Sequence, residues 1–179
     1  MCANIIGPIE RAMKDDRVTA LATALADLAA TSTLSDANLF AAPLADRYAR
    51  RMVWRDPEER FTIVAMTWGP GQGAQLHDHA GLWGAEIVVS GTMRECSYRA
   101  LERDPQRGTR FLPTSESVLE TGAIGLLVPP LEYHSYRNDA TTVSQTLHVY
   151  AGAFDACTAY SPSTDDWWTG ERRTLNYDI

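Results

Sequence analysis

Three of the four histidines in the chain fall in two short segments whose spacing could hold a metal ion. One residue separates His77 from His79, and His134 follows in a second turn-rich segment. Alternate side chains of an extended segment point to the same side, so a His-x-His pair directs both imidazoles to one place. A third imidazole from a distant strand would complete a three-nitrogen site with open positions for a substrate. This pattern favours a metal enzyme over loop histidines that bind nothing.

The elements that must position these histidines are predicted to be mainly strands. Four short segments are rich in β-branched or aromatic residues and bounded by Gly, Pro or Asp; they are 61–68, 86–90, 125–128 and 143–150. Before them, a leucine pattern predicts a helical segment over residues 8–30, and Ser35 with Asp36 could cap a second short helix that ends near Phe40. The fold class expected is mainly β, a small β-barrel or double-sheet jelly roll with an N-terminal helical segment.

Length favours a single domain. A chain of 179 residues can bury one sizeable core, and we expect a helical cap over 1–45, a barrel over 46–160 and a C-terminal tail over 161–179. The net charge of −7 argues against a nucleic-acid partner, and no stretch is apolar enough for a membrane span. Three widely spaced cysteines form no disulfide framework, so a cytoplasmic protein with reduced thiols is expected.

The two histidine segments resemble the two halves of the cupin signature. The matching positions are Gly71, His77, His79 and Gly91 in the first half, and Gly125, Pro129, His134 and Asn138 in the second. The glutamate ligand of many cupins is expected near Trp83 or Gly84 and is absent, while Glu86 lies slightly too far along, in a strand. Three neutral imidazoles would leave a divalent metal with its full charge, which favours an anionic group such as a thiolate. Fe, Zn, Cu and Ni all suit imidazole ligands.

From about Tyr48 to Tyr160 the sequence resembles the thiol dioxygenases related to cysteine dioxygenase and 3-mercaptopropionate dioxygenase. The resemblance rests on Tyr48-Ala-Arg50, Trp68-Gly-Pro-Gly-Gln with His77-Asp-His79, His134 in its Pro-containing strand, and Thr146-Leu-His148-Val-Tyr150. It implies ferrous iron held by His77, His79 and His134. It also implies an outer-shell relay of Thr146, His148 and Tyr150, with Thr146 where the family usually has serine. Arg50, with Tyr48 as its neighbour, would bind the carboxylate of the substrate, since a planar guanidinium suits that group.

Two departures from the family bear on the substrate. Gly84 stands where the animal enzymes carry the cysteine that cross-links to the active-site tyrosine, so no thioether is expected. Leu82-Trp83-Gly84 and Ala151-Gly152 are similar to the 3-mercaptopropionate enzymes, yet those usually lack the arginine that Arg50 supplies. The sequence therefore leaves cysteine, 3-mercaptopropionate and other thiol acids open as substrates.

The reaction implied is the addition of both atoms of O2 to the sulfur of a small thiol, which gives a sulfinate. Tyr150, held by His148 and Thr146, would donate a hydrogen bond to the bound oxygen or substrate. Alternatives at single residues stay open at this point. His148 could be a core histidine, Arg51 competes with Arg50, and Trp83 could line the pocket or only cover the barrel mouth. One of Arg172 and Arg173 could supply a second contact to an anion.

Two other functions compete with a thiol dioxygenase. One is a different metal-cupin chemistry, such as carbon–carbon dioxygenation or isomerisation, but those sites commonly use the carboxylate ligand that is missing here. The other is a non-catalytic cupin that senses a metal or binds a small anion. Such a module has no need for Tyr150 paired with His148 on a strand that faces the metal.

Overall fold

A computed structural model of the chain describes residues 3–15, 17–31, 33–35 and 39–178. The N-terminal region forms two helices, α1 (Ala3–Lys14) and α2 (Val18–Ala30), followed by a 3₁₀ turn, η1 (Thr33–Ser35). The expected helical segment over 8–30 therefore starts earlier and is divided at a charged stretch between Lys14 and Arg17. Ser35 ends η1, and most of the short helix expected after it lies outside the described residues.

The rest of the described chain consists of antiparallel strands and their connections. They are β1 (Ala49–Arg55), β2 (Thr62–Trp68), β3 (Gly73–His77), β4 (Gly84–Ser90), β5 (Thr92–Asp104), β6 (Gly108–Glu120), β7 (Ile124–Leu127), β8 (Tyr133–Arg137), β9 (Ser144–Tyr150), β10 (Ala156–Pro162) and β11 (Trp167–Thr174). The four expected strands are β2, β4, β7 and β9. The mainly β, cupin-type fold with an N-terminal helical part is confirmed.

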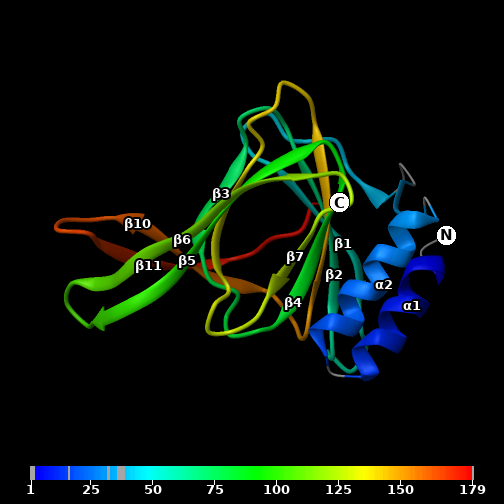
Figure 1. Ribbon diagram of the computed structural model, residues 1–179, viewed down its shortest axis with the longest axis horizontal. Helices are drawn as coiled ribbons and strands as arrows, with labels where there is room; N and C mark the ends of the chain where they lie inside the picture. The colour runs from blue at the N-terminus through cyan, green and yellow to red at the C-terminus, as the bar shows by residue number, and fades with distance from the viewer. Residues whose placement is uncertain (1–2, 16, 32, 36–38, 179) are drawn as a thin grey trace.

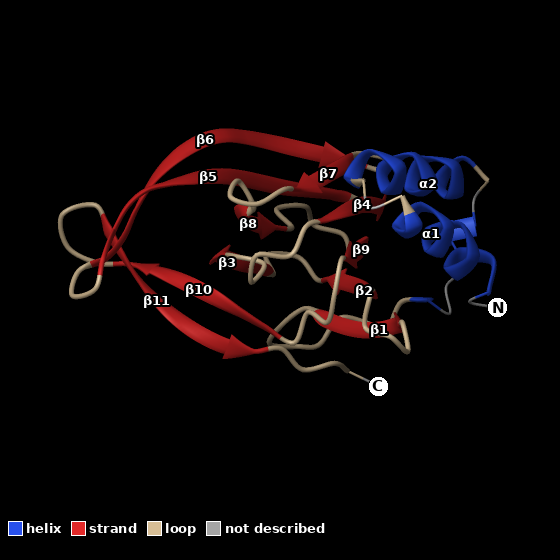
Figure 2. Cartoon of the chain, turned by 90° about the horizontal axis from the view of Figure 1, so that it is seen from below, coloured by secondary structure: helices blue, strands red, loops and turns tan. Residues whose placement is uncertain are grey.

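The strands form two sheets that enclose the interior of a barrel. One has the order β1-β2-β9-β4-β7, and the other, β10-β11-β6-β5-β8-β3, closes on itself through the pairing of Ala159 with His77. The helices cover the outer face of the first sheet (Figure 1). On the opposite side, the ribbons β5–β6 and β10–β11 extend away from the helices (Figure 2). The segment expected to be a C-terminal tail thus includes a paired strand, β11.

The sheet β1-β2-β9-β4-β7 separates two hydrophobic clusters, and the alternation of strand residues decides which cluster each side chain joins. In β2, Ile63 and Ala65 pack toward the helices, whereas Val64 and Met66 face the barrel interior. Every residue of β2 is buried, because both faces are covered. Each large apolar side chain buried in this way contributes about 1.5–3 kcal/mol. The same alternation recurs in β4 and β9 and positions the site described below.

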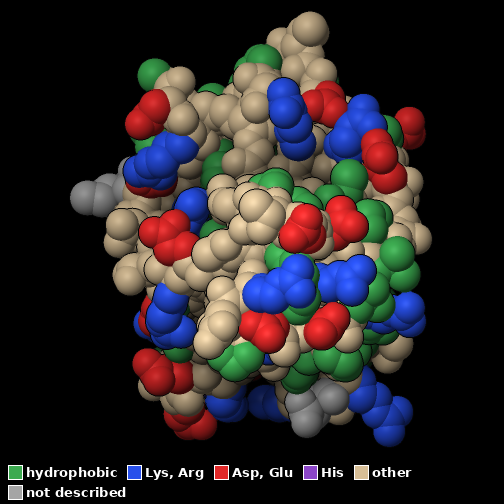
Figure 3. All heavy atoms as spheres, turned by 90° about the vertical axis from the view of Figure 1, so that its left-hand side faces the viewer, with side chains coloured by type: hydrophobic (Ala, Val, Ile, Leu, Met, Phe, Trp, Pro, Cys, Tyr) green, Lys and Arg blue, Asp and Glu red, His purple; other side chains and the backbone are tan. Residues whose placement is uncertain are grey.

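Charge is spread over the ends of the ribbons rather than gathered in one patch. In the view onto the ribbon tips, Lys and Arg side chains lie interspersed with Asp and Glu (Figure 3). None of the described helices is long and apolar enough to cross a membrane.

Candidate metal centre and substrate pocket

A cavity of about 160 Å³ lies between the two sheets and contains most of the residues singled out in the sequence. Its wall is formed by Tyr48, Arg50, Met66, Trp68, Gly73, Ala74, Gln75, His77, His134, Tyr136, His148, Tyr150, Phe154, Cys157, Ala159, Arg173 and Leu175. Both sheets contribute, so residues far apart in the sequence share one small space.

The three expected metal ligands lie together, and two of them, His77 and His134, are in the wall of this cavity, whereas His79 is not among the lining residues. His77 ends β3, His79 follows in the next loop, and His134 lies in β8, which pairs with β3 directly at His77. Their ligand nitrogens all lie within 4.8 Å of one another. The three ring centroids are 4.8 to 4.9 Å apart. The structure therefore brings the three histidines together as the spacing predicted.

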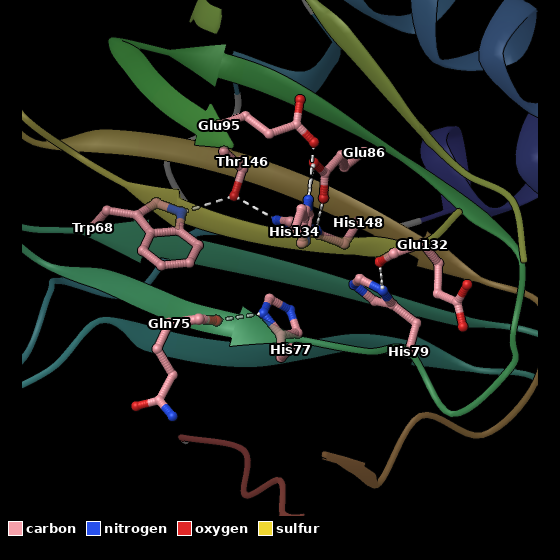
Figure 4. A network of polar contacts seen from close by, with 10 residues as sticks. All are labelled: Trp68, Gln75, His77, His79, Glu86, Glu95, Glu132, His134, Thr146 and His148. Atoms are coloured by element: carbon pink, nitrogen blue, oxygen red, sulfur yellow. Dashed lines mark hydrogen bonds and ion pairs between the residues drawn. The ribbon is translucent and has the colours of Figure 1, made fainter. Parts of the chain in front are cut away.

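Each of these imidazoles is oriented by an oxygen acceptor at Nδ1 (Figure 4). His77 Nδ1 lies 2.8 Å from Gln75 O, and His79 Nδ1 lies 2.8 Å from Glu132 O. His134 Nδ1 lies 2.9 Å from Glu95 Oε1. Since a carbonyl or carboxylate oxygen only accepts, Nδ1 carries a proton in each ring, and in the neutral imidazole Nε2 is then the atom with the free lone pair. This is the arrangement that metal-binding histidines adopt, so the residues present fit a divalent metal with three nitrogen ligands.

Burial favours the neutral imidazole that a metal ligand requires. Desolvation, followed by the nearby His134, lowers the pKa of His77 to about 3. Desolvation also lowers the pKa of His79 well below its ordinary value. In His134 burial acts in the same direction, but the carboxylates of Glu86 and Glu95 outweigh it and raise the pKa. The cluster is thus electrostatically uneven, because both acidic neighbours lie beside a single one of its histidines.

Glu86 places a carboxylate beside the histidine cluster, in a role that no sequence motif indicated. Its side chain is 1% exposed, and its two oxygens lie 3.7 Å from His134 Nδ1 and 2.9 Å from His148 Nδ1. Burial works to raise its pKa, but the two histidines outweigh burial and lower the pKa to about 2. Glu86 approaches the outer nitrogen of His134 rather than the ligand side, so it belongs to the support of the metal centre. In β4 it alternates with Ala85 and Ile87, which face the helices, and this alternation could have revealed its inward direction.

The relay of β9 runs to Glu86 rather than to Tyr150. Trp68 Nε1 donates to Thr146 Oγ1 at 2.8 Å, and Thr146 Oγ1 lies 2.7 Å from His148 Nε2 (Figure 4). His148 Nδ1 lies 2.9 Å from Glu86 Oε2, an ion-pair contact without hydrogen-bond geometry. Both ring nitrogens of His148 therefore face groups other than Tyr150, so Thr146 and His148 do not hold Tyr150 as expected. The ring of His148 instead stacks beside that of Tyr150, at 6.0 Å and 19°. Residues two apart on a strand share a face but stand side by side, which explains why His148 lies beside Tyr150 and does not point at it.

Tyr150 is buried in the cavity wall next to the histidine cluster. Its ring lies 5.9 Å from that of His79 and 4.3 Å from that of Phe154. Burial raises the pKa of Tyr150 well above its ordinary value, so its hydroxyl keeps its proton and can act as a hydrogen-bond donor.

Arg50 and Arg51 point to opposite faces of β1. Arg50 pairs with Met66 on the interior side, while Arg51 pairs with Ala65 on the helix side. Arg50 is 5% exposed and lies in the cavity wall, and among the described residues its Nη2 is buried without a hydrogen-bond partner. Tyr48 lies in the same wall, stacked on Trp68 at 4.1 Å. Of the two arginines, Arg50, which the family resemblance implied, lies in the cavity wall.

Trp83 does not line the cavity, which corrects its expected role in substrate binding. It packs against the hydrophobic cluster beneath the helices, on the same side of the sheet as Ala85 and Ile87. The neighbouring Gly84 faces Tyr150 across β4 and β9. A Cβ at Gly84 would lie 2.3 Å from Val149 O, so this backbone has no room for a side chain there.

Sequence reasoning missed several residues of the cavity wall. Arg173, one of the two C-terminal arginines considered above, lines it from β11, whereas Arg172 is not among the lining residues. Phe154 stacks on His79 at 5.5 Å, and Cys157 is a buried thiol whose pKa is raised to about 11 by burial. The loop that holds Phe154 lacks a strong periodic pattern, so no sequence signal marked this residue.

Comparison with known proteins agrees with this site. The sequence model of the family described as cysteine dioxygenase type I matches residues 4–163. The chain is 26% identical over 119 residues to cysteine dioxygenase type 1 from Danio rerio and 24% identical to that from Homo sapiens. Each match covers 66% of this chain and 58% of the relative, so the chain spans less than two thirds of the relatives' length.

Among solved structures, a cupin 2 conserved barrel domain protein from Rhodopseudomonas palustris is similar, with a TM-score of 0.49, 18% identity, and coverage of 66% of this chain and 69% of that one. A protein from Thermus thermophilus matches with a TM-score of 0.48, 22% identity, and coverage of 65% and 94%. Because the family match extends over most of the chain and includes all three clustered histidines, the chain belongs to the cysteine dioxygenase type I family.

Proposed function

We propose that this protein is an iron(II)-dependent thiol dioxygenase that converts a small carboxylated thiol, such as cysteine or 3-mercaptopropionate, into its sulfinate. The observation that carries the proposal is the shared cavity. Two members of the three-histidine cluster, His77 and His134, line the same cavity of about 160 Å³ as Arg50, whose buried Nη2 has no hydrogen-bond partner among the described residues. A small thiol acid could place its sulfur at the metal and its carboxylate, a few atoms away, at Arg50.

The histidines supply the metal site. His77, His79 and His134 would hold the ion through Nε2, and their Nδ1 partners fix the rings before the ion binds. Ferrous iron, when bound, supplies the redox chemistry that lets dioxygen react at a sulfur donor. The overall reaction is RSH + O2 → RSO2H, in which sulfur gives up the four electrons that O2 accepts and no further reductant is needed.

The remaining cavity residues bind and orient the substrate. Arg50 Nη2 has the donor capacity for a carboxylate oxygen, and a buried cation without a partner is costly unless an anion pairs with it. Tyr150 keeps its proton and donates a hydrogen bond toward the reacting sulfur or oxygen. His148, fixed between Thr146 and Glu86, supports the ring of Tyr150 by stacking. Phe154 and Met66 supply apolar walls that limit the entry of water.

The test is oxygen uptake by anaerobically iron-loaded protein, with the products identified by mass. Cysteine, 3-mercaptopropionate, mercaptosuccinate and cysteamine form the substrate panel, and zinc-loaded protein is the control because Zn²⁺ has no redox chemistry. We expect uptake of one O2 per thiol and a product two oxygens heavier for a carboxylated thiol. Equal rates with cysteamine would remove the carboxylate from recognition, and no uptake with any thiol by iron-loaded protein would refute the proposal.

A further inference from the structure

The segment that follows β11 crosses the edge of β1 and fixes the backbone of Arg50. β1 is an edge strand, so its outer backbone groups need partners other than a neighbouring strand. Asp178 N donates to Arg50 O at 2.6 Å, and Arg50 N donates to Asp178 Oδ2 at 2.9 Å. The other end of the segment is fixed by Leu175 N, which donates to Asp155 O at 2.8 Å. Figure 2 shows this last stretch of chain running below β1.

The same segment contacts the guanidinium of Arg50. The Arg50 Cζ lies 4.9 Å from the centroid of the Tyr177 ring and 5.9 Å from that of Phe154. Arg50 Nη1 donates to Asn176 O at 3.4 Å, a long hydrogen bond. The Tyr177 hydroxyl donates to Phe154 O at 2.9 Å, which holds the ring under the guanidinium. A planar cation over an aromatic face is a favourable contact that leaves the edge nitrogens of the guanidinium available.

The charge of the segment is directed away from the guanidinium. Both oxygens of Asp178 accept from Arg47, at 2.9 and 2.6 Å, so the carboxylate is neutralised on the outer side of β1. Arg50 thus meets a carbonyl and a ring face here, and both are neutral. A carboxylate beside Nη2 would compete with a substrate anion. The segment orients the guanidinium without occupying the nitrogen that is free among the described residues.

We propose that the ring of Tyr177 is a positioning residue for Arg50 and thereby determines how tightly the protein binds the carboxylate of its thiol. The inference rests on the proposed function. An arginine side chain has many rotamers, and an anion that must order it on binding loses affinity. Stacking on Tyr177 orders the side chain beforehand. The effect is specific to the carboxylate, because Tyr177 is not among the residues of the metal centre.

The test is calorimetric binding of thiols to iron-loaded protein without oxygen. Cysteine and 3-mercaptopropionate are each compared with the analogue that lacks the carboxylate, cysteamine and ethanethiol. Tyr177→Leu should bind the carboxylated thiols roughly tenfold more weakly and the analogues unchanged, whereas Tyr177→Phe, which keeps the ring, should stay close to wild type. Tyr98→Leu is the matched control, since Tyr98 is a partly buried tyrosine in the cluster of the far ribbons.

Three results would overturn the inference: unchanged binding of carboxylated thiols to Tyr177→Leu, equal weakening of both thiol classes, or a loss in Tyr177→Phe as large as in Tyr177→Leu. Oxygenation is measured separately. A carboxylate-specific loss in a protein that forms no sulfinate would support the positioning role and refute the dioxygenase. Sulfinate formation with equal weakening of both thiol classes would support the dioxygenase and refute the positioning role of Tyr177.

Discussion

The two ends of the cavity differ in the kind of group that they leave available to a ligand. At one end, the Nδ1 of each of the three histidines lies against an oxygen acceptor, and the nitrogens left free are those that face one another. At the other end, Arg50 is fixed by its backbone and by a ring, yet its buried Nη2 has no partner among the described residues.

The difference indicates what each end is built to receive. A cluster of oriented lone pairs suits a cation, and its geometry is complete within the protein. An unpaired buried donor is costly to retain, so its presence indicates an anion that arrives with the ligand. The proposed substrate joins the two ends, with sulfur at the metal and carboxylate at the arginine. Variants at the histidine end should therefore lose the metal, whereas variants at the arginine end should bind the substrate carboxylate less tightly.

Loss of a histidine should have the largest effect. His134→Ala removes one of the three proposed ligands and the partner of Glu95, so iron affinity should fall by more than about a hundredfold, beyond the usual cost of losing an outer-shell partner. Iron content after dialysis, measured by metal analysis, and oxygen uptake test this. His134→Ala that retains iron at the wild-type level would exclude His134 as a ligand.

Loss of the arginine should affect substrate and spare the metal. Arg50→Ala removes a charged hydrogen bond of about 1.5–3 kcal/mol, so KM for a carboxylated thiol should rise roughly 10- to 100-fold with iron content unchanged. Arg51→Ala is the matched control, because Arg51 lies on the helix side of the same strand. A KM for cysteamine that rises as much as that for cysteine would exclude carboxylate binding by Arg50.

Loss of an outer-shell carboxylate should have an intermediate effect at the metal end. Glu95→Ala removes the acceptor of His134 Nδ1 and should weaken iron binding about tenfold or somewhat more. Glu95→Gln, which keeps an acceptor oxygen but loses the charge, should lose less. Competition with a metal chelator measures both variants, and equal affinities in wild type and Glu95→Ala would remove Glu95 from the support of the site.

A substitution outside both ends of the cavity should alter neither substrate binding nor metal binding. Trp83→Leu removes apolar contacts beneath the helices and should lower Tm by a few degrees, for a loss of about 1 kcal/mol. KM and iron content should match wild type. Thermal unfolding and steady-state kinetics test this together, and a raised KM in Trp83→Leu would return Trp83 to the substrate site.

Sequence reasoning identified the metal end better than the substrate end. The histidines belong to two compact segments with a period of two, which a strand converts directly into a common direction. Arg50 was identified only through the family resemblance of Tyr48-Ala-Arg50, and Arg51 stayed open as an alternative until the pairing of β1 with β2 separated the two side chains. Glu86 was set aside on the basis of spacing alone, although its alternation with Ala85 and Ile87 points it inward. Trp83, left open between the pocket and the barrel mouth, packs instead against the cluster beneath the helices.

The sequence by itself determined the fold class, the three clustered histidines and the arginine, because each follows from local periodicity or a short motif. Only the tertiary structure decided what surrounds them. Glu95, Phe154 and Tyr177 reach the site from strands and loops that no local pattern connects, and their positions depend on how two sheets pack. The partner of His148 was likewise decided in three dimensions, where a neighbouring strand brought Glu86 closer than its own strand could bring Tyr150.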